Sequence, residues 1–494
     1  MAITSDMKIY PHSLRIQEGV RYFLARIDNS KKLIVQAEPG KLIPSGFIGE
    51  LRTLPDETAA ALVCPLSPSN TELMRTRFPF MRPCANPGFV RSLGLGDRLG
   101  LASPGHLDAL VDADFFPILA QQSMRELRLT GRTYPEVLDA ASWAVFQEGF
   151  DKGFGADGDH LKTGEEIDYA IRSGFTMITL DCSDYIHKDI ALLPPETVHT
   201  RYLDLPETER HLLEQKYVKS PHPNLLKLGI ILQPADLERT VLTYRAALSH
   251  MVEMYETRIR CAPHSVDYEI SIDETATITR PADHAFVALE LLQKGVRFTS
   301  LAPRFCGEFQ KGIDYRGDAM EFQHQFREHA KIARTLGYRL SIHSGSDKFR
   351  IFPIVGEEAS EGFHVKTAGT HWLEAVRVIA KHAPSLYRDM HAIALASLQD
   401  ARLFYHISAD EFRVPPLQEL SDAELPLLMD QEDARQILHI TYGHILKAPA
   451  TPAQAETLKS RIYATLDCYE TPYAASLCRH VKKHIDSLNQ NIRQ

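Results

Sequence analysis

The sequence predicts an α/β fold: a (β/α)₈ barrel of the TIM type with a small N-terminal α/β segment, an inserted subdomain and extra C-terminal helices. From about residue 90, short apolar runs alternate with amphipathic helical patterns, which is typical of βα units and a parallel sheet. Several of these patterns end in Gly directly before the next run, as helices commonly do. The length of 494 residues suits one such barrel with appended parts.

Eight apolar runs are the expected strands, and right-handed crossovers between them would close a barrel. They span 90–102, 153–160, 175–181, 265–273, 296–303, 340–345, 363–369 and 403–410. Residues 433–446 (DARQILHITYGHIL) are either a ninth strand or a helix. We expect a helix, because Asp433 can cap it and its apolar residues have helical spacing.

The predicted domain organisation is asymmetric. Residues 1–87 form the N-terminal segment, with strands at VRYFLARID and KLIVQAE and a Pro-, Ser- and Asn-rich linker over 67–87. Residues 88–494 form the catalytic barrel domain. Residues 185–263 are too long for one crossover helix and indicate an inserted subdomain or lid. C-terminal helices are expected from about residue 430, with two more after Pro452.

Composition excludes several function classes. The net charge of −9 argues against nucleic acid or an anionic membrane as partner. The sequence contains no run of 18 apolar residues, so we expect no segment that spans a bilayer. The N-terminus lacks the apolar region of a signal peptide, so we expect a cytoplasmic protein. The seven cysteines are dispersed without a CxxC pair, which indicates reduced thiols. Homo-oligomerisation is left open.

Polar residues gather where the expected strands end, and barrel enzymes build their active sites at the carboxyl ends of the strands. A structural network could explain one or two such ends, but not nearly all of them. The candidates for substrate binding, suited to a carboxylate or hydroxyl-rich molecule, are Asp97, Arg98, Lys162, Arg304, Lys348 and Lys366.

Asp159 and His160 form the sharpest pair of candidates. Gly155 and Gly158 permit the chain to turn there, so His160 could offer a ring nitrogen to a divalent metal while Asp159 acts as a base. The alternative is that Asp159 caps the next helix and His160 is an ordinary polar residue.

His343 follows an apolar strand and is a second candidate metal ligand, although a buried histidine bonded to a carbonyl would look the same. Two strand-end histidines together favour the metal. His371 and His406 are weaker candidates for a third ligand, and His371 also begins a helical pattern.

Glu269 lies in the alternating segment SVDYEISID, which places Asp267, Glu269, Ser271 and Asp273 on the inward face. An inward carboxylate needs partners. A metal or a substrate hydroxyl would supply them, and so would an ion pair with Arg304 or Lys366.

Organic cofactors find no support in the sequence. Gly94 and Gly96 resemble the start of a dinucleotide turn, but the third glycine, Gly100, is misplaced for GxGxxG and no acidic strand end follows nearby. No Walker loop, GxSxG elbow or HExxH occurs.

Five segments together resemble the tagaturonate/fructuronate epimerases of bacterial hexuronate catabolism: GDRLGLASPGH, GFGADGDHLKT, SVDYEISIDET, IHSGSDKFRIFP and HVKTAGTHWLEA. The resemblance implies a metal-dependent epimerase that interconverts D-tagaturonate and D-fructuronate by inversion at C4, with tagatose and fructose as related substrates. It implies Asp159 and Glu269 as the proton-transferring residues and His160 and His343 as metal ligands, with His371 at the third position.

C4 of a 2-ketose is not adjacent to the carbonyl, so simple enolisation cannot invert it. Retro-aldol cleavage between C3 and C4, rotation of the aldehyde and re-addition would do so, and direct proton abstraction at C4 is the alternative. Zn²⁺, Mn²⁺, Co²⁺ and Ni²⁺ all accept such ligands. A metal-dependent aldolase or ketose isomerase, and a non-catalytic sugar-binding protein, are the competing interpretations.

Overall fold

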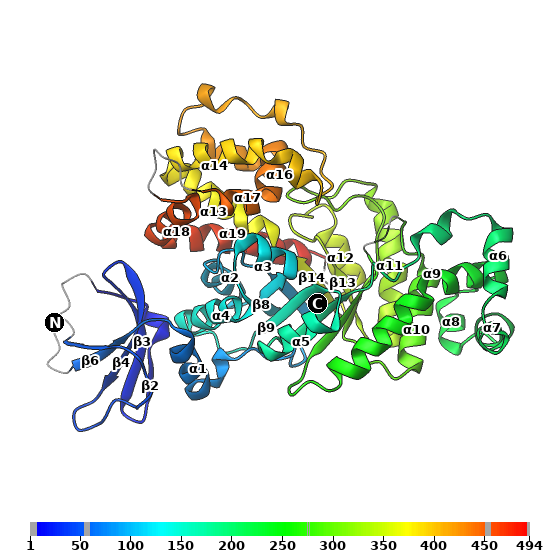
Figure 1. The fold of residues 1–494 in the computed structure, drawn as a ribbon, viewed down its shortest axis with the longest axis horizontal. Coiled ribbons are helices and arrows are strands. Elements are labelled where there is room, and N and C mark those ends of the chain that lie inside the picture. Colours follow the sequence, from blue (N-terminus) through cyan, green and yellow to red (C-terminus); the bar gives the residue numbers. More distant parts are fainter. Residues whose placement is uncertain (1–6, 54–59, 274, 276, 450–455, 492–494) are drawn as a thin grey trace.

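The computed structural model describes residues 7–53, 60–273, 275, 277–449 and 456–491. Its N-terminal part is an antiparallel sheet with strand order β1-β3-β4-β6-β5 and β2 paired to β3 (Figure 1). The strands are β1 (Lys8–Ile9), β2 (Arg15–Gln17), β3 (Val20–Ile27), β4 (Ser30–Ala37), β5 (Glu50–Thr53) and β6 (Ala60–Cys64). Both strands expected here are confirmed, as β3 and β4.

The stretch expected as a linker contains the helix α1 (Pro68–Arg77). Ser67 precedes it and its side chain accepts a hydrogen bond from the backbone N–H of Asn70. The Ser and Pro that suggested a linker are therefore the N-cap and the first residue of a helix, two positions where these residue types are favoured.

Eight parallel strands form a closed barrel, which confirms the predicted fold class. Their order around the barrel follows the chain, and β14 pairs with β7 to close it. The strands are β7 (Arg91–Leu95), β8 (Phe116–Ser123), β9 (Gly155–Leu161), β10 (Met177–Asp181), β11 (Asp267–Ser271), β12 (Ser300–Ala302), β13 (Arg339–Ile342) and β14 (Phe363–Thr367).

One expected strand was wrong and one was missed. Residues 403–410 form no strand, and Leu403 and Phe404 are largely exposed, so no sheet buries that apolar run. The missing strand is β8, whose sequence FPILAQQS begins with a Pro-containing apolar run and ends in Gln-Gln-Ser. All of its residues are buried, because one face meets the outer helices and the other the barrel interior.

The expected helix over 433–446 is confirmed as α16 (Glu432–Ile440) and α17 (Tyr442–Lys447). Its cap differs from the prediction: the side chain of Gln431 accepts from the Ala434 N–H, while Asp433 accepts from the Asp410 N–H.

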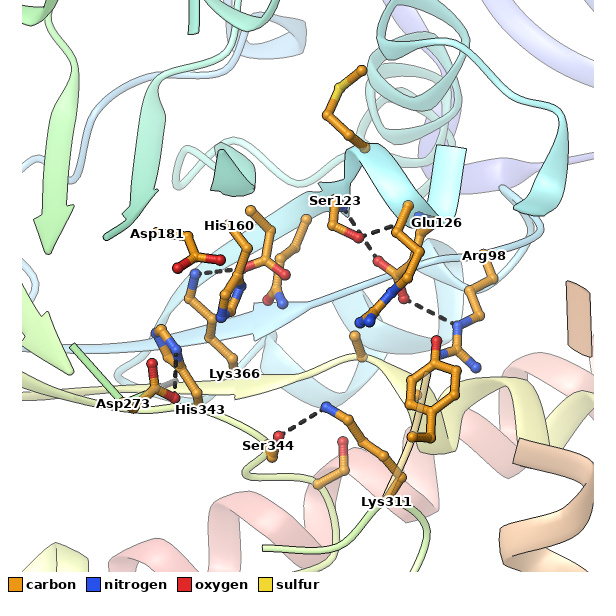
Figure 2. A pocket seen from close by; sticks show the side chains of 18 of the residues that line it. Arg98, Ser123, Glu126, His160, Asp181, Asp273, Lys311, His343, Ser344 and Lys366 are labelled. Carbon is orange, nitrogen blue, oxygen red and sulfur yellow. Dashed lines mark hydrogen bonds and ion pairs between the residues drawn. The ribbon is translucent and has the colours of Figure 1, made fainter. Parts of the chain in front are cut away.

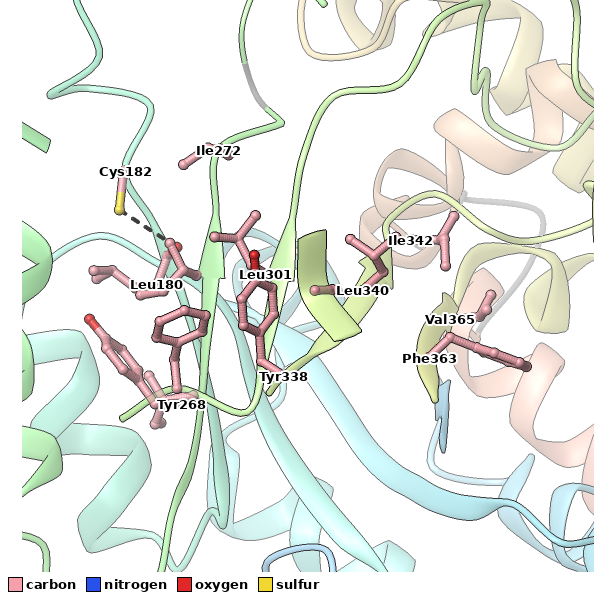
Figure 3. Packing of buried hydrophobic residues seen from close by; sticks show 14 of the residues in the cluster. Leu180, Cys182, Tyr268, Ile272, Leu301, Tyr338, Leu340, Ile342, Phe363 and Val365 are labelled. Atoms are coloured by element: carbon pink, nitrogen blue, oxygen red, sulfur yellow. Dashed lines mark hydrogen bonds between the residues drawn. The ribbon is translucent and has the colours of Figure 1, made fainter. Parts of the chain in front are cut away.

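Apolar side chains on the outer barrel face pack against the surrounding helices. Figure 3 shows this layer, in which Tyr268, Leu301, Leu340, Ile342 and Val365 belong to one large buried cluster. The covering helices are α2 (Ser103–Leu110), α4 (Tyr134–Glu148), α5 (Gly164–Arg172), α10 (Pro281–Gln293), α11 (Ala319–Leu336) and α12 (Phe352–Glu358). Because strand side chains alternate, the neighbours of these residues point into the barrel.

Two helical additions flank the barrel (Figure 1). Between β10 and β11 lie α6 (Pro195–Leu203), α7 (Glu207–Glu214), α8 (Pro223–Leu228) and α9 (Pro234–Met254), within the stretch expected as an insertion. The C-terminal addition has its own apolar core and includes α13 (Gly369–His382), α14 (Pro384–Ala396), α15 (Leu398–Arg402), α16, α17, α18 (Leu458–Cys468) and α19 (Glu470–Asn489). Among the described helices, none combines the length and apolarity that crossing a membrane requires.

Candidate active site

A cavity of about 370 Å³ opens at the carboxyl ends of the barrel strands. The ends of β8, β9, β10, β13 and β14 contribute to its walls, together with α3 (Met124–Thr130), the loop around Lys311, and α16. Figure 2 shows His160, His343, Asp273 and Lys366 on one side and Arg98, Glu126 and Lys311 on the other. The cavity therefore has two chemically different ends.

His160, Asp273 and His343 can hold a metal ion: one ligand atom from each lies within 4.8 Å of the others. Nδ1 of His343 is 3.2 Å from Asp273 Oδ2, and this buried nitrogen has no hydrogen-bond partner within the described part of the chain. Two imidazoles and one carboxylate suit Zn²⁺, Mn²⁺, Co²⁺ or Ni²⁺. The residues present therefore fit the divalent metal that the sequence predicts.

The local charge also favours a cation here. Burial alone would lower the pKa of the His343 ring, but the Asp273 and Glu269 carboxylates outweigh burial and raise it to about 10. Glu269 Oε1 lies 2.8 Å from Nε2 of His343. When that nitrogen carries its proton toward Glu269, the Nδ1 lone pair faces Asp273, which is how outer carboxylates orient histidine ligands.

His160 stands at a turn in the chain. Its φ of +54° is left-handed, which confirms that the backbone already turns at this strand end. Its Nδ1 lies 2.9 Å from Asp159 Oδ1. Gly158 serves packing instead of the turn, because a Cβ there would come within 2.9 Å of Leu161 and 3.1 Å of Ala170.

Lys366 is surrounded by three buried carboxylates at the base of the cavity. Its Nζ is 2.7 Å from Asp157 Oδ2, 2.7 Å from Asp159 Oδ1 and 3.0 Å from Glu269 Oε1. The ion-pair alternative for Glu269 is therefore realised with Lys366. Thr179 and Ser300 also donate hydrogen bonds to Glu269.

The three carboxyl groups around Lys366 differ in pKa. Burial opposes ionisation of Asp159, but the Lys366 ammonium and the His160 ring outweigh it and hold its pKa well below the usual range. Lys366 and His343 do the same for the pKa of Glu269. Burial and the two neighbouring carboxylates instead raise the pKa of Asp157 to about 6. Asp159 is thus an ionised carboxylate at the cavity wall.

Several predicted residues lie elsewhere or have other partners. The ring of His371 is 4.4 Å from that of His106, and its Nδ1 lies 3.0 Å from the Gly96 carbonyl oxygen. It does not join His160 and His343 within the described residues; Asp273 is instead the third member of the group that could hold a metal.

The remaining predicted substrate-binding residues divide in two. Arg98 and Lys162 line the cavity: Arg98 pairs with Glu126 at 3.2 Å, and Lys162 donates to Asp184 at 2.8 Å. The Asp97 carboxylate instead accepts from backbone N–H groups of the following loop. Arg304 donates to the Thr275 carbonyl. Lys348 lines the cavity but donates to three carbonyl oxygens, of Gln310, Ile313 and Ser346.

Comparison with known proteins agrees with this geometry. A family model described as tagaturonate epimerase matches residues 10–488. The tagaturonate/fructuronate epimerase of Thermotoga maritima is 39% identical over 484 residues, which are 97% of each chain. The chain belongs to the tagaturonate/fructuronate epimerase family. It is therefore an isomerase.

Crystal structures of the fructuronate-tagaturonate epimerase UxaE from Cohnella laeviribosi have the same fold. The native structure gives a TM-score of 0.92 at 45% identity, covering 98% of this chain and 97% of that one. A complex with one glycerol gives the same TM-score and identity, with 98% and 96% coverage. The likeness thus extends over the N-terminal sheet and both helical additions as well as the barrel.

Sequence reasoning missed some residues of this epimerase cavity. Asp273 was on the inward face together with Glu269, and that alternation could have identified it as a candidate third ligand. Arg125 and Lys311 lie on α3 and on a loop, outside the expected strands, so no strand pattern marked them. Because β8 was not predicted, the start of α3 at its end could not be placed at the cavity.

Proposed function

We propose that this chain interconverts D-tagaturonate and D-fructuronate by inversion at C4, using a divalent metal. The observation that carries the proposal is the meeting, in one cavity, of the His160–Asp273–His343 group with the ionised carboxylate of Asp159. These three residues would hold the metal, and the metal would polarise the C2 carbonyl and C3 hydroxyl of the ketose.

The chain's own residues supply proton transfer. Asp159 accepts the proton of the C4 hydroxyl; the C3–C4 bond then breaks, its electron pair moves toward C2, and C4 becomes an aldehyde. Rotation of the aldehyde and re-formation of the bond invert C4. We assign protonation of the new C4 alkoxide to Lys162, whose pKa is raised by Asp184 and Asp181 against the effect of burial, so that it stays an ammonium. Asp159 then releases its proton to water, and Lys162, whose side chain is 40% exposed, takes one up from water, which restores both groups.

Glu269 was expected to transfer a proton, and we propose a positioning role for it instead. Its side chain is fully buried and its oxygens contact Thr179, Ser300, His343 and Lys366. With its hydrogen-bonding capacity occupied, Glu269 acts on the substrate through the His343 ring that it orients.

The far end of the cavity suits the substrate carboxylate. A ketohexuronate carries its carbonyl at C2 and its carboxylate at C6, so the two groups need different partners at opposite ends. Arg98, Arg125, Arg128 and Lys311 line the cavity, and Figure 2 shows Arg98 and Lys311 across it from the candidate metal ligands. The Arg125 guanidinium stands 4.8 Å from the Tyr405 ring centroid, which leaves its N–H groups for an anion. We infer a preference for uronates over tagatose and fructose.

The test is incubation of the purified protein with D-tagaturonate, with a chelator and after metal is restored. The proposal expects D-fructuronate as the single product, loss of activity with the chelator and recovery with Zn²⁺, Mn²⁺, Co²⁺ or Ni²⁺. Three-carbon fragments would indicate an aldolase instead. No conversion under any condition would support a sugar-binding protein without catalytic activity.

A further inference from the structure

A second group of metal-ligating side chains lies outside the catalytic cavity. Asp347 follows β13 in the loop that begins with His343, and His480 and His484 are one turn apart on α19. One ligand atom of each lies within 4.8 Å of the others. All three side chains are at most 10% exposed. None of them lines the catalytic cavity described above.

Hydrogen bonds give His484 the tautomer that a metal requires. Its Nε2 accepts from the Asp347 backbone N–H at 3.0 Å, so that nitrogen carries a lone pair. Its Nδ1 lies 2.8 Å from the His480 carbonyl oxygen and donates to it. An unprotonated Nε2 with the other ring nitrogen bonded to an oxygen is the usual arrangement of histidine ligands.

His480 is arranged in a similar way. Its Nε2 is 2.9 Å from the Thr370 hydroxyl oxygen, and its Nδ1 is 3.7 Å from Glu374 Oε1. The two imidazoles of His480 and His484 therefore approach Asp347 from two turns of one helix, as in other helical sites with histidines four residues apart.

Asp347 Oδ1 completes the group. It lies 3.2 Å from Nε2 of His480 and 3.3 Å from Nε2 of His484, yet it is buried and has no hydrogen-bond partner in the described part of the chain. Oδ2 of the same carboxylate is paired with Arg435. A buried carboxylate oxygen that faces two imidazole nitrogens without a proton between them is unfavourable unless a cation is shared.

The spacing fits one small cation. Ligand atoms on a tetrahedron with metal bonds of about 2.0–2.2 Å are roughly 3.3–3.6 Å apart, and the two distances observed are close to the lower value. We propose that Asp347, His480 and His484 bind a second divalent transition metal, of the Zn²⁺ class, that joins α19 to the loop carrying His343. The cation replaces the Asp347 N–H at His484, and water fills the fourth position.

The consequence is a structural role separate from catalysis. Ser344 and Asp347, in this loop, both have left-handed backbone conformations, with φ of +52° and +59°. Such conformations persist where surrounding contacts fix them. A metal between the loop and α19 would fix the loop from its outer side, while His343 faces the catalytic cavity.

The experiment measures metal stoichiometry on the full-length protein, loaded with Zn²⁺, dialysed and analysed by mass spectrometry. The proposal expects two ions per wild-type chain and one in His480→Gln and in His484→Gln. Lys482→Gln on the same helix is the matched control and should keep two. His160→Gln combined with His343→Gln should lose only the catalytic ion and keep the other.

A spectroscopic measurement covers variants that fold poorly. Co²⁺ bound to the double variant His160→Gln/His343→Gln should give the visible absorption of tetrahedral Co²⁺, which Asp347→Asn added to that background should abolish. An ion count that is the same in the wild type, in His480→Gln and in His484→Gln would overturn the proposal. Neither measurement depends on epimerase activity, so it can fail while the proposed function stands.

Discussion

Lys366 Nζ lies 2.7 Å from Asp159 Oδ1 and is the counter-charge that keeps Asp159 ionised inside the barrel. The same ammonium also contacts Asp157 and Glu269. One side chain on β14 therefore sets the charge state of carboxylates on β9 and β11.

Lys366→Met should destabilise the protein by about 3–5 kcal/mol at pH 8, because it leaves buried carboxylates without a counter-charge. In the wild type, the lowered pKa values of Asp159 and Glu269 add stability above their ordinary pKa, and this is lost only as the pH falls through the lowered values. In the variant these pKa values rise, so its deficit should shrink from pH 8 to pH 5. Urea unfolding at both pH values measures this, with Lys162→Met as control. An equal deficit at both pH values would contradict it.

Asp159→Asn should reduce kcat about 10²–10⁴-fold, since it removes the proton acceptor while keeping the shape of the side chain. KM should change little at saturating metal, whereas the metal affinity should fall because Asp159 also contacts the His160 ring. Steady-state kinetics with metal analysis on the same preparation checks this. A variant with more than a tenth of wild-type kcat would exclude Asp159 as the base.

Asp273→Asn should weaken metal binding at the catalytic site about 10–100-fold or more and lower activity in parallel. His371→Gln is the control for this site, because His371 contacts Gly96 and His106 and is not a member of the His160–Asp273–His343 group. Competition with a chromophoric chelator gives both affinities. The assignment of the third ligand would be reversed if His371→Gln lost the metal and Asp273→Asn retained it.

Arg125→Gln should lower kcat/KM for D-tagaturonate about 10–100-fold, which corresponds to the loss of a charge-assisted hydrogen bond of roughly 1.5–3 kcal/mol. The value for D-tagatose should remain within about twofold, because that ketose has no carboxylate for the guanidinium to bind. Side-by-side assays measure the ratio, provided that the wild type turns over both ketoses. Equal losses on both substrates would show that Arg125 does not recognise the carboxylate.

Epimerisation in D₂O distinguishes the two routes to inversion at C4. Retro-aldol cleavage leaves the C4 hydrogen on carbon, so fructuronate formed in D₂O should contain no deuterium at C4. Proton NMR of the product at early conversion reads this directly. Deuterium at C4 would instead support direct proton abstraction.

The parts of the fold that could be predicted from the sequence are those marked by side-chain periodicity. Glu269 and Tyr268 alternate between the barrel interior and the helix layer, as SVDYEISID indicates. Periodicity could not separate β8 from residues 403–410, because both are short apolar runs and only tertiary burial distinguishes them.

The candidate site was predicted in part for a related reason. Asp159, His160 and His343 line the cavity, and the sequence could identify them because they stand at the ends of apolar strands. Asp273 lies two residues beyond β11, and Arg125 is on a helix, so their place in the cavity depends on how loops and helices return to the barrel mouth. The positions of Asp273 and Arg125 in the sequence do not indicate that these loops and helices fold back to the cavity.

Closure of the barrel by β14 also changes the charge of its interior. β14 is the last strand of the barrel, and it carries Lys366 into the interior at the moment it pairs with β7 and β13. A chain that has assembled β7 to β13 without it holds Asp157, Asp159 and Glu269 together with no ammonium among them. Mutual repulsion would keep such an incomplete barrel open to water or protonated, so a partly closed form is disfavoured as a resting state. We therefore expect docking of the final strand and neutralisation of the interior to occur together.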